Sequence, residues 1–169
     1  MLALLVAQNI AFYVIAAIMV LSAIRVVTTD NVLHAALWLV IVLAGVGAQF
    51  ILLAAEFVAI TQVLVYLGAI IVLFLFGIML TRTQAGDARD ADHRGPVKIA
   101  ALVLGAALLG LMSYALLDGF RDSEFGDMVV QRTAEVSDSI FSTYLLPFEV
   151  LSVLLLAALI GAIVLARRD

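Results

Sequence analysis

The sequence predicts an all-α, polytopic membrane protein with five transmembrane helices. Hydrophobic residues make up 66% of the 169 residues and charged residues only 13%, whereas a soluble domain is about half apolar and about a quarter charged. Five stretches are also mostly apolar over about 20 residues, the length that a helix needs to cross the hydrocarbon core of a bilayer. We therefore expect residues 1–169 to form a single membrane domain with the lipid bilayer as its main surroundings.

The predicted spans cover residues 3–24, 33–53, 57–80, 99–117 and 145–165. The first stretch has no positively charged leader region and no small-residue cleavage site, so it is interpreted as a retained span and not as a signal peptide. The connection Ala54-Ala55-Glu56 is so short that the second and third spans are predicted to form an antiparallel helical hairpin. Residues 81–98 are predicted as a charged loop, and residues 118–144 as a long, acidic loop.

The positions of Lys and Arg predict the orientation. With five spans, the loops after the first and third spans lie on the same side as the C-terminus. Seven of the nine basic residues fall on that side: Arg25, Arg82, Arg89, Arg94, Lys98, Arg167 and Arg168. Only Arg121 and Arg132 fall on the other side. Because basic residues are enriched in cytoplasmic loops, we expect loop 81–98 and the C-terminus in the cytoplasm, and the N-terminus and loop 118–144 outside.

Several kinds of chemistry are excluded or disfavoured by composition. The chain has no cysteine, which excludes disulfides, iron–sulfur ligation and thiol chemistry within it. No polybasic patch suggests nucleic acid as a partner, and no catalytic motif suggests an active site. Asp87, Asp90, Asp92 and His93 are interpreted as a solvated turn and not as a metal site. No cofactor or metal is therefore expected in this chain.

Two carboxylates are candidates for function, because a charge at membrane depth is costly. Glu56 is predicted to open the third span, and Glu149 to lie in the first turn of the fifth, after Pro147. Each can act as an interfacial cap at the positive end of a helix, or face a hydrated path between subunits. The central part of every predicted span lacks Asp, Glu, Lys, Arg and His. This absence argues against ion translocation by the chain alone.

The third span contains the deepest polar groups. At about 100° per residue, Gln62 and Tyr66 lie on one face, one turn apart. Tyr66 is predicted near the middle of the bilayer, where its hydroxyl needs a hydrogen-bond partner. Three partners are open: Gln62, a neighbouring helix, or water. Gly68 allows either close helix packing or a local deformation of the helix.

Other side chains of the spans are interpreted as structural. His34 and Trp38 share a face at the inner end of the second span, near Arg25, and are predicted to anchor that end at the membrane interface. Small residues four apart, such as Ala44 and Ala48, favour close packing between helices.

The third span also supports a family resemblance. It runs from Ala55 to Leu80 and contains Gln62, Val65-Tyr66-x-Gly68-Ala69, Val72-Leu73-Phe74-x-Phe76 and Met79-Leu80. A second match is Pro147-Phe148-Glu149, followed by Leu154-Leu155-Leu156-Ala157 and Gly161-Ala162. The first two spans agree through Arg25 and Asn31-Val32-Leu33-His34-Ala35-Ala36. Over essentially its whole length, the chain resembles chain 6 (subunit J) of NADH:quinone oxidoreductase, the respiratory complex I.

This resemblance implies a non-redox subunit of a proton-pumping translocase, in the inner (plasma) membrane of a cell. The implied partners are other membrane subunits, especially the small ones near the quinone module. FMN, iron–sulfur clusters and quinone are expected on partner subunits. Alternatives are the equivalent subunit of a ferredoxin-, deazaflavin- or hydrogenase-linked complex, a purely structural scaffold subunit, and a stand-alone transporter, which the apolar span centres disfavour.

The resemblance also implies a mechanism for the third span. In the family this helix forms a π-bulge near the Tyr-x-Gly element, and conversion between the bulged and regular forms rotates its distal half. Carried over to this chain, Tyr66 borders a hydrated path from the quinone site to the proton channels, and Gly68 eases the deformation. Gln62, Glu56 and Glu149 are further candidates for proton movement or gating.

Overall fold

Helices make up almost all of the residues that the structure describes. The computed structural model describes residues 2–81, 95–121 and 132–167, and those residues contain no β-strand. Five helical stretches are long and apolar enough to cross a membrane: Val6–Thr28, Val32–Leu52, Glu56–Leu80, Ile99–Gly119 and Leu145–Ala166. The all-α fold with five spans is thus confirmed. The predicted boundaries are close to those observed, although the first helix continues to Thr28 and the fourth already begins at Gly95.

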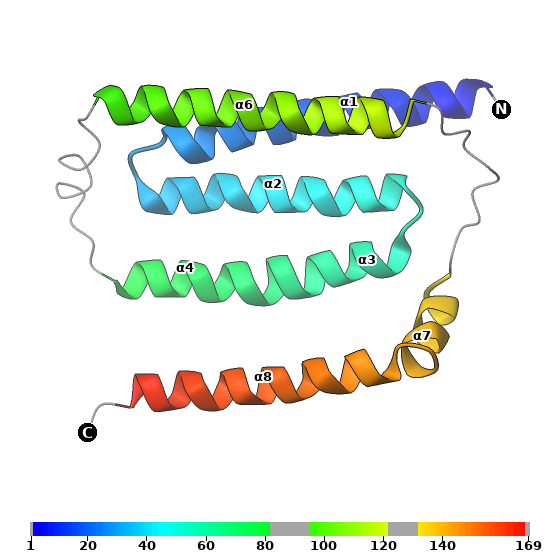
Figure 1. The fold of residues 1–169 in the computed structure, drawn as a ribbon, viewed down its shortest axis with the longest axis vertical. Helices are drawn as coiled ribbons and strands as arrows, with labels where there is room; N and C mark the ends of the chain where they lie inside the picture. The colour runs from blue at the N-terminus through cyan, green and yellow to red at the C-terminus, as the bar shows by residue number, and fades with distance from the viewer. Residues whose placement is uncertain (1, 82–94, 122–131, 168–169) are drawn as a thin grey trace.

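The helices follow the chain in a simple order (Figure 1). They are α1 (Leu2–Thr28), α2 (Val32–Leu52), α3 (Glu56–Thr61), η1 (Gln62–Ile70), α4 (Ile71–Leu80), α6 (Gly95–Gly119), α7 (Thr133–Phe141) and α8 (Leu145–Ala166). The third span is built from α3, η1 and α4 in succession. Successive spans run in opposite directions, so the ends of α1, α4 and α8 lie at one end of the molecule. That end is named the inner end, and the opposite one the outer end.

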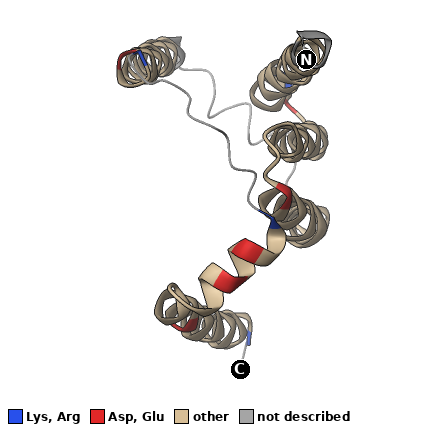
Figure 2. Cartoon of the chain, turned by 90° about the vertical axis from the view of Figure 1, so that its right-hand side faces the viewer, with Lys and Arg blue, Asp and Glu red and all other residues tan. Residues whose placement is uncertain are grey.

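The first three spans form a row with α2 in the middle. Helix α2 packs against α1 on one side and against α3, η1 and α4 on the other. The view along the helices shows the same row, with α6 standing apart from it (Figure 2). This three-helix row, from α1 to α4, contains all the residues that are buried in the described part of the chain.

Two glycines let α2 pack on both sides. A Cβ atom at Gly45 would lie 2.3 Å from Cγ of Met19 on α1. A Cβ atom at Gly47 would lie 3.6 Å from Cγ of Gln62 and 3.7 Å from Cγ2 of Val63 on η1. Because two residues span about 200° of a helix, the two glycines face opposite neighbours. The side chain of Met19 therefore occupies the space that Gly45 leaves open.

Two glutamines add polar contacts between α1 and α2. Nε2 of Gln8 donates a hydrogen bond to the carbonyl oxygen of Leu52 at 2.9 Å, and Nε2 of Gln49 donates one to that of Phe12 at 3.3 Å. Both bonds join residues near the outer end. Inside a membrane, side-chain amides that bond across helices help to hold them together. They fix the register of α1 against α2.

The turn between α2 and α3 contains a non-glycine residue in the left-handed region. Ala54 has a φ of 55°. Its N–H donates to the carbonyl of Ile51 at 3.0 Å, and the N–H of Ala55 donates to that of Phe50 at 2.9 Å. These two bonds form a Schellman motif, which usually has glycine at the left-handed position. The motif reverses the chain within three residues, and the predicted hairpin of the second and third spans is confirmed.

The predicted loop 118–144 is wrong in one part, because it contains the helix α7. The partly buried side chains of α7 are Thr133, Val136, Ser137 and Ile140, whose spacing gives an amphipathic helix. Sequence analysis missed it because it is short and rich in residues with modest helix propensity. Helix α7 contacts both α3 and α8, and the rings of Phe141 and Phe148 meet edge to face at 5.2 Å. It thus connects the row to α8 at the outer end.

Helices α6 and α8 differ from the row because they bury nothing. Among the described residues, α6 contacts no other helix and α8 contacts only α7. None of the residues in their most hydrophobic windows is buried. In a bilayer such helices are covered either by lipid or by other polypeptides. The chain therefore does not close into a helical bundle of its own.

Candidate functional site

The third span is interrupted by a π-helical segment. This segment, η1, covers nine residues between α3 and α4. At its end, the N–H of Ile71 donates to the carbonyl of Tyr66, five residues earlier, in place of the four-residue step of an α-helix. Helices of the π type are rare and are often found at functional sites. The segment includes both Tyr66 and Gly68, so the π geometry lies where the resemblance places it.

Gln62 holds the beginning of this segment against α2. Its side chain is only 7% exposed, and its Nε2 donates a hydrogen bond to the carbonyl oxygen of Leu43 at 3.3 Å. Gly47 provides the space that the side chain occupies. The amide therefore bonds to α2 and not to Tyr66, which was one of the three partners left open by the sequence.

Tyr66 lies near the middle of the third span and faces away from the row. It is the eleventh residue of the 25-residue stretch Glu56–Leu80, and 46% of it is exposed. Its hydroxyl makes no hydrogen bond with any residue that the structure describes. In contrast, Ala59 and Ile71 of the same span are buried. In a membrane, the phenol is thus open to a partner from outside the chain, either another polypeptide or water.

Gly68 lies next to the carbonyl group of Val63, one helical turn earlier in the chain. A Cβ atom at this position would be 3.4 Å from that oxygen, which belongs to the residue five positions earlier. Alanine would therefore fit in the π form, whereas a β-branched side chain would stiffen the helix at this point. Gly68 is exposed, so no close contact with a neighbouring helix of this chain requires it.

The two carboxylates lie at the outer end, but on separate helices. Glu56 is the first residue of α3, as predicted. The prediction for Glu149 is wrong, because α8 begins at Leu145 and its first turn holds no acidic residue. Glu149 is the fifth residue of α8, whereas the effect of the helix dipole falls off within the first turn. Helices α3 and α8 do not contact each other, so the chain alone does not bring Glu56 and Glu149 together.

The described residues contain no group of His, Asp and Glu side chains that could hold a metal ion. Asp87, Asp90, Asp92 and His93, interpreted above as a solvated turn, lie outside the described residues.

The contacts that position the candidate site were not predicted from the sequence. It did not single out Gly45 and Gly47, although glycines on two faces of an apolar helix can indicate two packed neighbours. It also missed Gln8 and Gln49, whose amides within apolar spans were a usable signal, because buried amides need partners.

Comparison with known proteins agrees with these features. The sequence pattern of the NADH-ubiquinone/plastoquinone oxidoreductase chain 6 family matches residues 22–165. Over 96% of its length, the chain is 38% identical to the NAD(P)H-quinone oxidoreductase chain 6 of Synechocystis sp., with 82% of that protein covered. It is 33% identical to NADH-quinone oxidoreductase subunit J of Escherichia coli, with 88% of that protein covered. It is 36% identical to F(420)H(2) dehydrogenase subunit J of Methanosarcina mazei, with 92% covered. The chain therefore belongs to the NADH-ubiquinone/plastoquinone oxidoreductase chain 6 family.

Proposed function

We propose that this chain is a non-redox membrane subunit of a proton-pumping NADH:quinone oxidoreductase, and that its third span couples quinone reduction to proton translocation. The similarity to NAD(P)H-quinone and NADH-quinone oxidoreductase subunits supports membership of such a complex. The uncovered helices α6 and α8 also support a subunit role, because they leave apolar surface for partner subunits. FMN, iron–sulfur clusters and quinone belong to those partners in this proposal.

The main support for this mechanism is the π-helical segment η1. Conversion of η1 to a regular α-helix would move the hydrogen-bond register by one residue, which turns the following helix by roughly 100°. The bond from Gln62 to Leu43 holds the beginning of the segment on α2. The part that turns is therefore α4, at the inner end. Two packings of one element that differ in this way can act as a gate.

Tyr66 and Gly68 have distinct roles in this gate. The hydroxyl of Tyr66 borders a hydrated path shared with a partner subunit and passes protons through oriented hydrogen bonds. Gly68 keeps the backbone free to change between the two helical forms. Glu56 and Glu149 are secondary candidates, which meet the path at the outer end only through partner subunits.

We also propose how the chain is oriented and which membrane holds it. The N-terminus and α7 lie outside, and the inner end faces the cytoplasm of a cell whose plasma (inner) membrane holds the complex. The excess of Lys and Arg in the segments after the first and third spans supports this orientation.

Tyr66→Phe tests the relay directly in the intact complex. Phenylalanine keeps the packing and removes only the hydroxyl, so the protons moved per NADH oxidised should fall strongly while assembly is unchanged. Tyr114→Phe on α6 is the matched control, because Tyr114 is also an exposed tyrosine of an apolar span. An unchanged ratio of protons to NADH in Tyr66→Phe would refute the relay.

Gly68→Val tests the change of helical form. A branched side chain beside the carbonyl of Val63 should hold the segment in one form and slow coupled turnover. Gly77→Val is the control, because a Cβ atom there meets nothing within 4 Å. Normal turnover in Gly68→Val would rule out a conformational change at this point.

A second candidate is the equivalent subunit of an F(420)H(2) dehydrogenase, favoured by the 36% identity to the Methanosarcina mazei subunit J. The two candidates differ in the electron donor, which this chain does not bind in either case. Gentle detergent extraction followed by assays with NADH and with reduced coenzyme F420 separates them. Recovery of the chain as a lone homo-oligomer would contradict both.

A further inference from the structure

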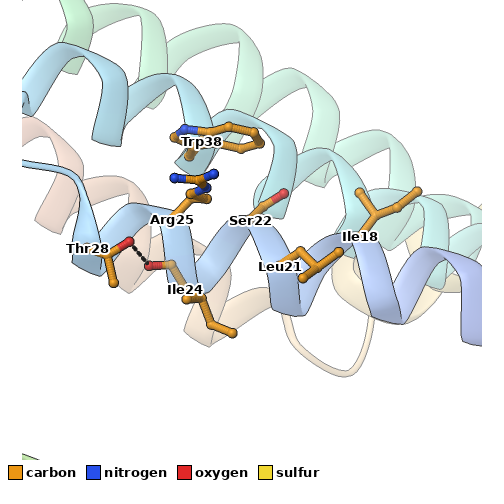
Figure 3. A pocket seen from close by; sticks show the side chains of 7 residues that line it. All are labelled: Ile18, Leu21, Ser22, Ile24, Arg25, Thr28 and Trp38. Carbon is orange, nitrogen blue, oxygen red and sulfur yellow. Dashed lines mark hydrogen bonds between the residues drawn. The ribbon is translucent and has the colours of Figure 1, made fainter.

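An open cavity of about 520 Å³ lies between α1 and α2 near the inner end. The proposed coupling mechanism does not use it. Helix α1 supplies most of its walls and α2 supplies one aromatic ring (Figure 3). The lining includes Ile18, Leu21, Ser22, Arg25 and Thr28 from α1, and Trp38 from α2. Ile18, Leu21, Arg25 and Thr28 are spaced three or four apart, so they form one face of that helix.

The polar end of this cavity holds Arg25. The guanidinium of Arg25 forms no ion pair or side-chain hydrogen bond with any described residue. Figure 3 shows it pointing toward the indole ring of Trp38, which lies directly above it. The hydroxyl of Thr28 is already used, because it donates to the carbonyl of Ile24 at 2.8 Å. The cavity thus presents a permanent positive charge with five N–H donors, the geometry that suits a phosphate group.

The other end of the cavity is apolar. Ile18 and Leu21 continue the same face of α1 toward the middle of the span. The whole α1 wall of the cavity, apolar and polar parts together, extends over ten residue steps from Ile18 to Thr28, or about 15 Å at the rise of an α-helix, which is half of the roughly 30 Å hydrocarbon core. This wall therefore matches the reach of a lipid acyl chain from the interface to the bilayer centre.

We propose that this cavity is a binding site for an anionic glycerophospholipid of the leaflet at the inner end. Arg25 binds the phosphate, Trp38 covers it at headgroup level, where aromatic residues are enriched, and an acyl chain lies along Ile18 and Leu21. The side that Lys and Arg predict to be cytoplasmic carries the anionic lipids of a cell membrane. A carboxylate from a partner subunit would neutralise Arg25 equally well, but it would not need the apolar wall beside it.

Trp38 is the only tryptophan of the chain, so its fluorescence reports on this cavity alone. The full chain is reconstituted in vesicles of phosphatidylcholine and phosphatidylglycerol, in which one lipid or the other carries bromine and quenches a neighbouring indole. Phosphatidylglycerol should quench about fivefold more than its share of the lipid predicts, the enrichment that one basic residue near an anionic surface gives. Arg25→Gln should abolish this preference, and Arg121→Gln, at the other end of the molecule, should keep it.

Several results would overturn the proposal. Equal quenching by both lipids in the unmodified chain, or a preference that persists in Arg25→Gln, removes the role of Arg25. Loss of the preference on addition of inorganic phosphate assigns the site to free phosphate. If Arg25→Gln loses helical content by circular dichroism, the site is tested on the unmodified chain instead, by comparing its quenching preference with and without phosphate. In the intact complex, native mass spectrometry should detect one anionic lipid fewer in Arg25→Gln. An unchanged number means that a neighbouring subunit covers the cavity, and refutes the site.

Discussion

The three-helix row and the pair α6 and α8 are built from equally apolar sequence, yet they pack differently. In the row, α2 joins α1 to the third span through Gly45, Gly47 and side-chain amides. In the described residues, α6 has no such contact, and α8 has only its link to α7. Hydrophobicity thus decides whether a helix enters the membrane, whereas small residues and paired polar groups decide which helix it packs against.

The row and the pair α6 and α8 also differ in the roles that we expect of them. The row carries the π segment, and the gate proposed for that segment works only if one side of it stays fixed. The pair α6 and α8 presents continuous apolar surface, which partner subunits of a complex can cover. We therefore expect the row to be stable in the isolated chain and the other two helices to be fixed only on assembly.

The largest expected effect is a loss of oxygen access to α6 when the chain assembles into the complex. Because the chain has no cysteine, single spin labels can be attached after Leu104→Cys, Leu109→Cys or Ala59→Cys. Collision with oxygen, which concentrates in the bilayer, should be high at both α6 positions in the isolated chain. At one of them or both it should fall several-fold in the complex, while the label at Ala59, which is 4% exposed, is shielded throughout. Unchanged access at both α6 positions would show that lipid and not protein covers this helix.

Gly45→Ala should damage the row more than any other small substitution. The new Cβ atom would collide with Met19, and overpacking of this kind costs about 1–3 kcal/mol of unfolding free energy. Unfolding in mixed detergent micelles measures the change. Gly110→Ala on α6 is the matched control, because a Cβ atom there meets nothing within 4 Å. The double substitution with Met19→Ala should recover part of the loss, and a loss that does not depend on Met19 would exclude this collision.

Ala54→Gly should stabilise the hairpin. A left-handed conformation costs a non-glycine residue about 1–2 kcal/mol, and glycine avoids this cost at the price of greater freedom in the unfolded chain. We expect a net gain of about 1 kcal/mol in the same unfolding assay. Ala55→Gly next to it, outside the left-handed region, should give no gain. A loss of stability in Ala54→Gly would contradict the strain.

Gln62→Leu should have the smallest effect on stability. Leucine keeps the size of the side chain and removes the hydrogen bond to Leu43, and such bonds between membrane helices contribute about 0.6 kcal/mol on average. The effect on coupling should be clearer, because the beginning of the π segment loses its attachment to α2. Gln8→Leu removes a similar bond, between α1 and α2. It should lower stability by about as much as Gln62→Leu and leave coupling intact. Equal coupling in both variants would refute the anchoring role of Gln62.

Much of the candidate site could be predicted, but not its surroundings. The apolar stretch 57–80 and the short Ala54-Ala55-Glu56 connection predicted the third span and its hairpin, because both are local features. The bond between Gln62 and Leu43 could not be predicted, because it depends on how far α2 and η1 slide along each other. The start of the fifth span at residue 145 was predicted correctly, but Glu149 is the fifth residue of α8 and so lies just beyond its first turn.

The sequence by itself determined the multi-pass membrane character, the number of spans and the absence of cysteine, because these follow from composition and from the length of apolar stretches. Only the tertiary structure decided that α2 lies in the middle of a row, that Gln62 faces it while Tyr66 faces outward, and that α6 stands apart. The physical reason is that insertion into lipid depends on the sum of many side chains, whereas packing inside lipid depends on a few. A single missing Cβ atom or one paired amide selects the neighbour, and its effect is visible only once both helices are in place.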